Sequence, residues 1–401
     1  MPIGFSNSIL TTSASSTTGA DFSSYDGSND ITTTVSLGVK NWMGFMNFDD
    51  TYGVVFYTKD QSGSNNDKIM ARLVTKASDD SLTFGSEVEH STTNSTGYTQ
   101  FAGVICRTQA NEIFVKFKDN AQARVYREVN QALAQSNAFS FSVGVSGSSG
   151  AYNTGEQDES GNDKFIYTDN DKTLKSFILG NADANTPFIT SAAETTFTPG
   201  HLNFDRSVKG FFNSSTLLGT FNTDGTNSTD TFKVNKLVIG NTSMTNTFSG
   251  LGTFDNLDNL GGHYAIEQAT PYFPTTDFSD RYLLLERRTT NGGEVRMTQY
   301  KSGDTTYSQD TLQDSTIAQF DISCGGCYLG GDDTTFFLMV PDFGEGEFAI
   351  VRYNTSTNSL TRPLLIDEGS SISAEEARFA RWGNSRGIML YDTNKVRIIK
   401  P

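Results

Sequence analysis

Few residues of this chain have the types and spacing that redox chemistry needs. The best-spaced thiols are Cys324 and Cys327, in a Cys-Gly-Gly-Cys segment. A reactive pair of this spacing lies at a helix N-terminus, whereas this segment is predicted to be an inner β-strand. We therefore interpret both cysteines as packing residues. The chain has three cysteines, too few for a disulfide framework or a thiolate metal site.

Two segments carry closely spaced side-chain oxygens that could bind calcium. Asp224 to Asp230 places such side chains at alternate positions, and Thr168 to Asp171 is similarly rich in oxygen. The first lacks the glycine at position six and the glutamate at position twelve of an EF-hand loop, and the second is also incomplete. A solvated turn explains the same residue types. We expect no cofactor, with calcium at these turns as the open alternative.

No set of residues predicts nucleophilic or acid–base catalysis. The histidines, His90, His201 and His263, are not near a Gly-x-Ser-x-Gly elbow, and isolated histidines in polar loops are usually solvated. Neighbouring acids such as Glu345 and Glu347 are explained by an acidic surface, because a glycosidase pair is defined by a separation in space. We predict that the protein is not an enzyme and assign no catalytic, cofactor-binding or metal-binding residue.

The charge and hydropathy patterns exclude two classes of partner. The formal net charge is −16 and lysines and arginines do not cluster, so we expect no nucleic-acid binding. No window approaches about 18 uninterrupted apolar residues, so we expect no membrane insertion. The N-terminal sequence lacks a basic segment followed by a long apolar one, and no Sec signal peptide is predicted.

The elements that would position a site are predicted to be β-strands. Ser, Thr, Asn, Gly and Asp separate short apolar runs, which is typical of a β-rich chain with many turns. Only Ala121–Ala134 and Ala374–Ala380 have helix-favouring composition. The first of these alternates well enough to be a strand followed by a loop.

The clearest run of strands is Tyr52 to Val88. It predicts an antiparallel meander with an apolar strand, a polar loop, an alternating strand from Ile69 to Lys76 and a short strand around Leu82 to Phe84. With the preceding apolar run, Trp42 to Phe48, it makes four strands, which is the size of one propeller blade.

The same strand–turn–strand unit recurs about every 50 residues. Its starts are Tyr52, Glu112, Lys164, Val208, Tyr282, Phe336 and Gly387. The longest interval follows Val208 and contains His263 to Glu267, which is an inserted hairpin or the remnant of another unit. We predict an all-β chain that forms a single β-propeller of about seven four-stranded blades, with six or eight as alternatives.

The N-terminal segment is predicted to close the ring. The last unit has an inner strand at Arg378 to Trp382 and two further strands, and lacks a fourth. Ser8 to Ala14 or Ile31 to Leu37 would supply that strand and remove two exposed sheet edges. The chain is thereby divided into an N-terminal segment, residues 1–38, that holds a closing strand or an arm, and a propeller, residues 39–401.

Blades of this form resemble the irregular β-propellers in virion proteins of tailed bacteriophages, which occur in tail nozzles, hubs and fibres. The resemblance covers most of residues 40–401, includes the segment Leu82 to Ser86 (Leu-Thr-Phe-Gly-Ser), and carries over no site residue. It implies a non-enzymatic structural protein of the tail or a tail appendage, made in the host cytoplasm, that acts in assembly or host attachment. The implied partners are other virion proteins, copies of this chain in the particle and a host-surface glycan.

The alternative function is a carbohydrate-binding or glycan-active β-propeller adhesin. Trp42 and Trp382 are the first candidates for exposed rings that would bind sugar, although both lie in predicted inner strands, where a core position is expected. An exposed aromatic pair beside carboxylates would favour the adhesin. Large polar interfaces between copies of the chain would favour the virion protein.

Overall fold

The protein is described by a computed structural model that places the chain in these segments: 25–60, 67–92, 103–107, 112–117, 122–140, 152–157, 163–168, 173–180, 188–196, 208–213, 216–222, 232–239, 244–246, 270–272, 281–288, 294–301, 308–313, 327–331, 335–341, 347–354, 356–367, 378–383 and 386–401. Within these residues the secondary structure consists of strands, arranged in seven antiparallel sheets. No helix that could cross a membrane occurs in this described part.

The first three sheets follow one another along the chain. Sheet 1 contains β2 (Asn41–Asn47), β3 (Tyr52–Asp60), β4 (Asp67–Lys76) and β5 (Leu82–Thr92). Sheet 2 contains β6 (Gly103–Arg107), β7 (Glu112–Phe117) and β8 (Gln122–Val129), and both β9 (Ala132–Gln135) and β10 (Phe139–Ser140) pair with β8. Sheet 3 contains β11 (Tyr152–Gln157), β12 (Asp163–Thr168), β13 (Thr173–Gly180) and β14 (Phe188–Thr196).

The next three sheets have the same order, and the last sheet combines both ends of the described chain. Sheet 4 contains β15 (Val208–Asn213), β16 (Thr216–Asn222), β17 (Phe232–Ile239) and β18 (Met244–Asn246), and sheet 5 contains β19 (Thr270–Tyr272), β20 (Arg281–Arg288), β21 (Glu294–Lys301) and β22 (Ser308–Gln313). Sheet 6 contains β23 (Cys327–Gly331), β24 (Thr335–Pro341), β25 (Glu347–Asn354) and β26 (Ser359–Asp367). Sheet 7 contains β27 (Arg378–Trp382), β28 (Arg386–Tyr391), β29 (Lys395–Ile399) and β1 (Ile31–Thr34).

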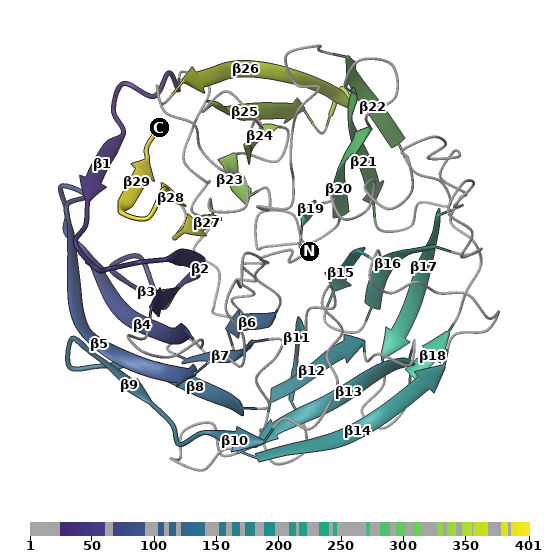
Figure 1. Cartoon of the computed structure of the whole chain (residues 1–401). Coiled ribbons are helices and arrows are strands. Elements are labelled where there is room, and N and C mark those ends of the chain that lie inside the picture. The colour runs from purple at the N-terminus through teal and green to yellow at the C-terminus, as the bar shows by residue number, and fades with distance from the viewer. Residues whose placement is uncertain are drawn as a thin grey trace.

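The sheets stand around a common axis, and their innermost strands are β2, β6, β11, β15, β19, β23 and β27 (Figure 1). Successive innermost strands contact one another from β2 through β6, β11, β15, β19 and β23 to β27, and β27 contacts β2. The prediction of an all-β propeller is thereby confirmed for the fold class. A single four-stranded sheet cannot bury both of its faces, and this arrangement supplies each face with a neighbour.

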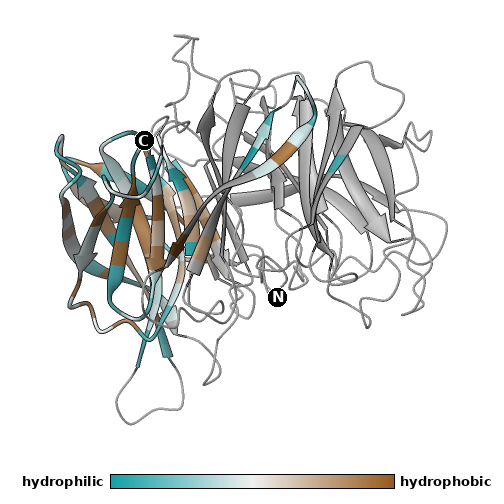
Figure 2. Cartoon of the chain, turned by 90° about the horizontal axis from the view of Figure 1, so that it is seen from above, coloured by the Kyte–Doolittle hydropathy of each residue, from teal (hydrophilic) through white to brown (hydrophobic). Residues whose placement is uncertain are grey.

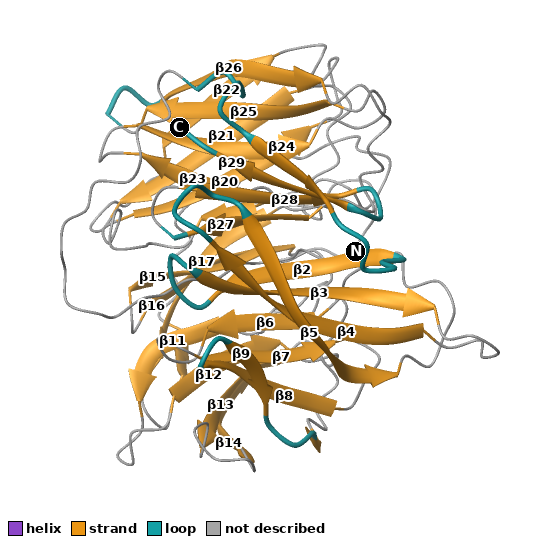
Figure 3. Ribbon diagram, turned by 90° about the vertical axis from the view of Figure 1, so that its left-hand side faces the viewer, coloured by secondary structure: helices purple, strands orange, loops and turns teal. Residues whose placement is uncertain are grey.

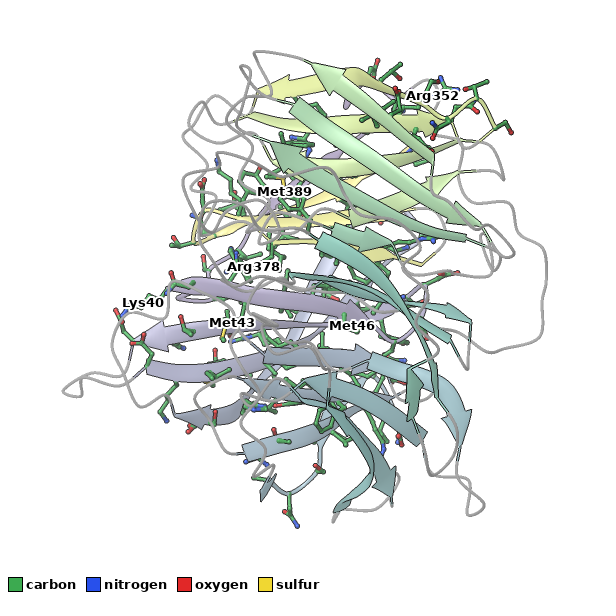
Figure 4. The ribbon with its side chains drawn as sticks, turned by 90° about the vertical axis from the view of Figure 1, so that its right-hand side faces the viewer. Lys40, Met43, Met46, Arg352, Arg378 and Met389 are labelled. Atoms are coloured by element: carbon green, nitrogen blue, oxygen red, sulfur yellow. The ribbon has the colours of Figure 1, made fainter. Side chains whose placement is uncertain are left out.

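The side chains of sheet 1 show why its strands are apolar on both faces. On β2, Trp42 and Phe45 belong to the core shared with sheet 7, whereas Met43 and Met46, labelled in Figure 4, belong to the core shared with sheet 2. A register shift between Trp42 and Gly44 marks a bulge in this strand. In Figure 2 the coloured strands carry hydrophobic residues along their length and hydrophilic residues toward their turns.

The outer edge of sheet 7 is formed by the N-terminal strand β1. It pairs antiparallel with β29, with Ile31 opposite Ile398 and Thr34 opposite Lys395. This strand lies within Ile31–Leu37, one of the two segments expected to supply it, and Ser8–Ala14 lies outside the described residues. The pairing covers the edge of β29, which would otherwise present unpaired backbone groups.

Two sequence-based expectations need correction. The strand expected around Leu82 to Phe84 is β5, which runs from Leu82 to Thr92, because register shifts opposite β4 let the pairing continue past the predicted end. The predicted start of the fourth repeat, Val208, lies one strand too early. Val208 begins the first strand of sheet 4, and the second strand, β16, begins at Thr216. Inner and second strands are both apolar, so their patterns do not distinguish them.

The helix-favouring segments form strands where they are described. Residues 122–129 form β8 and residues 132–135 form β9, joined by a tight turn in which Asn130 and Gln131 have positive φ angles of 53° and 65°. Residues 378–380 of the second segment belong to β27. Packing between sheets overrides a weak helical preference.

Candidate functional site

Among the side chains that the structure describes, polar and aromatic groups gather at the interface between sheets 1 and 7. We call this interface the closing seam, and Figure 3 shows the two sheets stacked there. Side chains on alternate positions of β28 and β29 face sheet 1, and the connection between β1 and β2 inserts three apolar side chains. The buried core of the seam contains Val35, Leu37, Val39, Trp42, Phe45, Val55, Tyr57, Met70, Val74, Ala380, Trp382, Ile388, Leu390, Val396 and Ile398.

Both tryptophans of the chain lie in the closing seam. The Trp42 side chain is fully buried and donates from Nε1 to the Tyr391 carbonyl oxygen at 3.3 Å. Trp382 is 1% exposed and donates from Nε1 to the Asp49 carbonyl oxygen at 3.1 Å. Each indole therefore crosses the seam to bond the opposite sheet. Neither ring is available as a sugar-binding platform, in agreement with the predicted core positions.

A buried carboxylate connects the turn after β4 to sheet 7. Asp80 has a side chain that is 4% exposed, and it accepts a hydrogen bond from Arg386 Nε at 3.0 Å. Lys400 Nζ lies 3.2 Å from its other oxygen, and Lys76 Nζ lies 3.6 Å away. Burial by itself would raise the pKa of Asp80, but the hydrogen bonds from Arg386 and Lys400 outweigh it and hold this pKa below its ordinary value of 3.8. Asp80 is therefore ionised at neutral pH.

A second carboxylate holds the N-terminal turn, residues 25–30, against sheet 7. Asp30 accepts hydrogen bonds from Tyr25 Oη at 2.6 Å, from Arg397 Nε at 2.7 Å and from the Lys400 backbone N–H at 3.0 Å. Its side chain is 2% exposed. Burial, followed by the charge of Asp30, raises the pKa of Tyr25 and keeps its hydroxyl protonated as a donor. Asp30 therefore binds the N-terminal turn to β29 and to the residue that follows it.

We call Asp30, Asp80 and their cationic partners the ionic clasp. Lys400 belongs to both halves, since its backbone bonds Asp30 and its side chain pairs with Asp80. The guanidinium of Arg397 also lies over the Phe348 ring of sheet 6, at 5.1 Å from the ring centre. The clasp thus links the N-terminal turn, sheet 1 and the C-terminal end of the described chain. Its contacts hold these three parts together, and loss of the contacts would release them.

The sequence between β27 and β28 matches a catalytic pattern, but the described strands on either side of it differ from those of the catalytic motif. Residues 383–387 read Gly-Asn-Ser-Arg-Gly, but the segment joins two antiparallel strands, whereas a nucleophile elbow joins a strand to a helix. Gly383 has φ +62°, and a Cβ there would lie 1.9 Å from Asp50 Oδ1. Arg386 is bound to Asp80. The glycine serves close packing across the seam.

The interface between sheets 1 and 2 contains the histidine that sequence reasoning placed wrongly. His90 was expected to be solvated, yet it is fully buried because β5 extends to Thr92 and carries it against sheet 2. Its Nδ1 and Tyr126 Oη share a hydrogen bond at 2.7 Å. Tyr126 packs edge-on against Phe56 at 5.3 Å between ring centres. The predicted strand ended near Phe84, and His90 was therefore expected in a loop.

The other chemistry-bearing candidates are not brought together within the described residues. Thr168 ends β12, and both Asp169–Asp171 and Asp224–Asp230 lie outside these residues, as do His201 and His263. Cys327 begins the first strand of sheet 6, as predicted for an inner strand, and Cys324 lies outside. No group of three or more His, Cys, Asp or Glu side chains that could hold a metal ion is present in the described part.

Comparison with known proteins supports the fold. No protein-family model matches the chain, and no curated protein matches it in sequence. The WD40 domain of coronin from Toxoplasma gondii is similar in structure, with a TM-score of 0.51, 10% identity, and coverage of 93% of this chain and 87% of that chain. The WD40 domain of SCAP from fission yeast has a TM-score of 0.43 at 8% identity, covering 93% of this chain and 98% of that chain. At such identities the likeness to coronin concerns the β-propeller fold alone.

Proposed function

We propose that this β-propeller is a non-enzymatic structural protein of a tailed-phage virion, placed in the tail or a tail appendage, where it acts in assembly or host attachment. The non-enzymatic part of this proposal rests on the polar groups of the closing seam, which make hydrogen bonds within the chain itself. Asp30, Asp80 and both tryptophans bond neighbouring segments of the same chain. A rigid ring built in this way presents its surface to partners without performing chemistry.

The virion assignment rests on the resemblance of the blade pattern to phage propellers. The acidic, polar composition is in keeping with a soluble component of a particle. Its partners would be other virion proteins and further copies of this chain, with a host-surface glycan as the target of attachment. We propose neither a nucleic-acid partner nor a resident cofactor.

Mass spectrometry of purified particles from the source tests this function. We expect the chain at a stoichiometric level, in a fixed ratio to the major virion proteins through successive density gradients. Loss of the chain during purification, or its recovery only from culture supernatant without particles, would contradict the proposal.

An assay on host polysaccharide separates the virion protein from the adhesin or glycan-active alternative. The purified chain should release no oligosaccharide. Depolymerisation that a single carboxylate substitution abolishes would overturn the non-enzymatic assignment. The buried tryptophans remove the first candidates for a sugar-binding surface, so sugar binding without hydrolysis would have to involve other residues.

A further inference from the structure

The closing seam is held together in part by ion pairs between two buried carboxylates and cationic side chains. Asp80 belongs to sheet 1, and two of its cationic partners, Arg386 and Lys400, come from sheet 7 or the residues directly after it. Asp30 belongs to the N-terminal turn, and its cationic partner Arg397 lies on β29. Each carboxylate thus binds together two segments that are far apart in the sequence.

We propose that the ionic clasp is an acid-released latch: when Asp80 loses its charge, residues 25–40 separate from β29 and the closing seam opens while the other sheets stay folded. This inference goes beyond the proposed function and does not depend on it. It assigns to the fold a preferred point of opening, at the junction of sheets 1 and 7.

Neutralising Asp80 leaves the positive groups around it without their common partner. Lys76 from β4, Arg386 from β28 and Lys400 after β29 all face this carboxylate, and the exposed carboxylate nearby is that of Asp79 in the same turn. Removing one member of a buried ion pair is strongly destabilising, because the remaining charge stays in a poorly solvated place. Here three cations from both sides of the seam would repel one another.

The N-terminal half of the clasp is coupled to Asp80 through Lys400, whose backbone N–H bonds Asp30 and whose side chain pairs with Asp80. Asp30 faces Tyr25 from its own turn, Arg397 from β29 and the Lys400 backbone, and it also lies within electrostatic reach of Tyr391 on β28. The strand that it anchors, β1, has four residues with side chains that are half-buried or exposed. Such a short outer strand has little apolar burial of its own, so loss of the anchor favours its release.

The direction of the pH effect follows from linkage. The folded-state pKa of Asp80 is depressed, so its contribution to stability is complete above the ordinary value of 3.8 and is lost as the pH falls through the lower folded-state value. The latch is therefore closed at neutral pH and opens in acid.

The two tryptophans provide a natural reporter, since both are buried in the closing seam. The full-length chain would be titrated from pH 7 to pH 2 while tryptophan emission, acrylamide quenching and far-ultraviolet circular dichroism are recorded on the same samples. We expect the emission to shift to the red and quenching to increase at a pH at which the β-sheet signal is still that of the native protein. Coincident transitions in all three signals would overturn the latch, because they would show global unfolding.

Two matched substitutions in one turn identify the responsible group. Asp80→Asn removes the buried charge with little change in shape and should make the tryptophans accessible to acrylamide at pH 7. Asp79→Asn removes the exposed neighbouring charge and should leave the emission and its acid transition unchanged. An Asp80→Asn protein whose tryptophan signals follow the wild type throughout the titration would refute the proposal.

Lys400→Gln provides a test if Asp80→Asn does not fold. It removes one cation of the clasp while keeping the Asp80 pairs with Lys76 and Arg386. The tryptophan transition should move to higher pH while the circular dichroism transition stays in place. An unchanged tryptophan transition would contradict the role of the clasp.

Discussion

The closing seam and the interface between sheets 1 and 2 have similar apolar cores but different polar contacts. The seam adds two buried carboxylates with cationic partners, whereas the other interface adds the His90–Tyr126 hydrogen bond. The buried core between sheets 1 and 2 contains Met43, Met46, Phe48, Val54, Phe56, Ile69, Ala71, Leu73, Ile113, Val115 and Tyr126. Sheets 1 and 2 are neighbours along the chain, while the seam joins residues more than 300 positions apart.

The sequence separation gives a physical reason for the difference. Bringing distant segments together costs more conformational entropy than docking consecutive sheets, although the cost grows slowly with length. The seam offsets that cost with apolar burial, with the pairing of β1 and β29, and with the clasp. It also gains specificity, since Asp30 and Asp80 accept partners only when the ends of the chain are in register.

Deletion of residues 1–38 should have the largest effect. It removes the N-terminal turn, β1, and the buried Val35 and Leu37, so the edge of β29 and one side of the seam are exposed together. We expect aggregation or failure to fold, observed by size-exclusion chromatography and circular dichroism. A soluble, truncated protein with an unchanged melting temperature would mean that the ring closes within residues 39–401.

Truncating one aromatic residue in each interface should cost similar amounts. Trp382→Ala in the seam and Phe56→Ala between sheets 1 and 2 should each lower the free energy of unfolding by about 3–5 kcal/mol, as is typical for buried aromatic side chains. Urea unfolding followed by circular dichroism measures both values. Val129→Ala, at an exposed position, should change the stability by less than about 0.5 kcal/mol and is the control. A near-neutral Trp382→Ala would show that the two cores are not equivalent.

Gly383→Ala should destabilise the seam by an intermediate amount. A left-handed backbone costs a residue with a Cβ about 1–2 kcal/mol, and the new methyl group would also collide with Asp50. Adding Asp50→Ala should restore the steric part of the loss and leave the backbone part. Thermal melts of the two single variants and the double variant separate these contributions. Equal stability of Gly383→Ala and the wild type would contradict the close packing.

Tyrosine substitutions should have smaller effects that change with pH. Burial raises the pKa of Tyr126, and burial followed by the charge of Asp30 raises that of Tyr25. A raised folded-state pKa gives stability that is complete below the ordinary value of 10.0 and declines as the pH rises above it. Tyr126→Phe should cost about 1 kcal/mol at pH 7 and flatten the alkaline decline, because it removes one hydrogen bond and one ionisable group.

Tyr25→Phe is the corresponding test for the N-terminal turn that packs against sheet 7. Urea midpoints between pH 7 and pH 11 should show the same flattening for this variant. A variant of either tyrosine whose alkaline decline matches the wild type would show that the substituted hydroxyl does not contribute to it.

The smallest expected effect concerns an exposed ion pair within sheet 1. Lys68 and Glu89 are 2.6 Å apart, with side chains that are 36% and 42% exposed. Lys68→Ala should reduce the stability by less than about 1 kcal/mol, and salt should remove most of that difference. A loss as large as that of Trp382→Ala would indicate a role for Lys68 beyond this pair.

Local pattern alone determined four strands of sheets 1 and 7: β2, β3, β27 and β28. The apolar runs that begin at Trp42, Tyr52 and Gly387 correspond to β2, β3 and β28, because a strand with both faces buried needs nearly continuous apolar residues. The inner strand at Arg378 to Trp382 was predicted at its observed bounds. The core positions of both tryptophans were also expected, since each lies within such a run.

Tertiary structure decided the length of β5, the placement of β15 and the surroundings of polar groups. The sequence shows Asp79 and Asp80 as equivalent neighbours in a turn, yet one carboxylate is exposed and the other is buried among three cations. His90 looked like a solvated histidine and is a core residue. The physical reason is that hydrophobic periodicity is local, whereas a buried polar group depends on partners that the fold brings from Arg386, Lys400 or Tyr126.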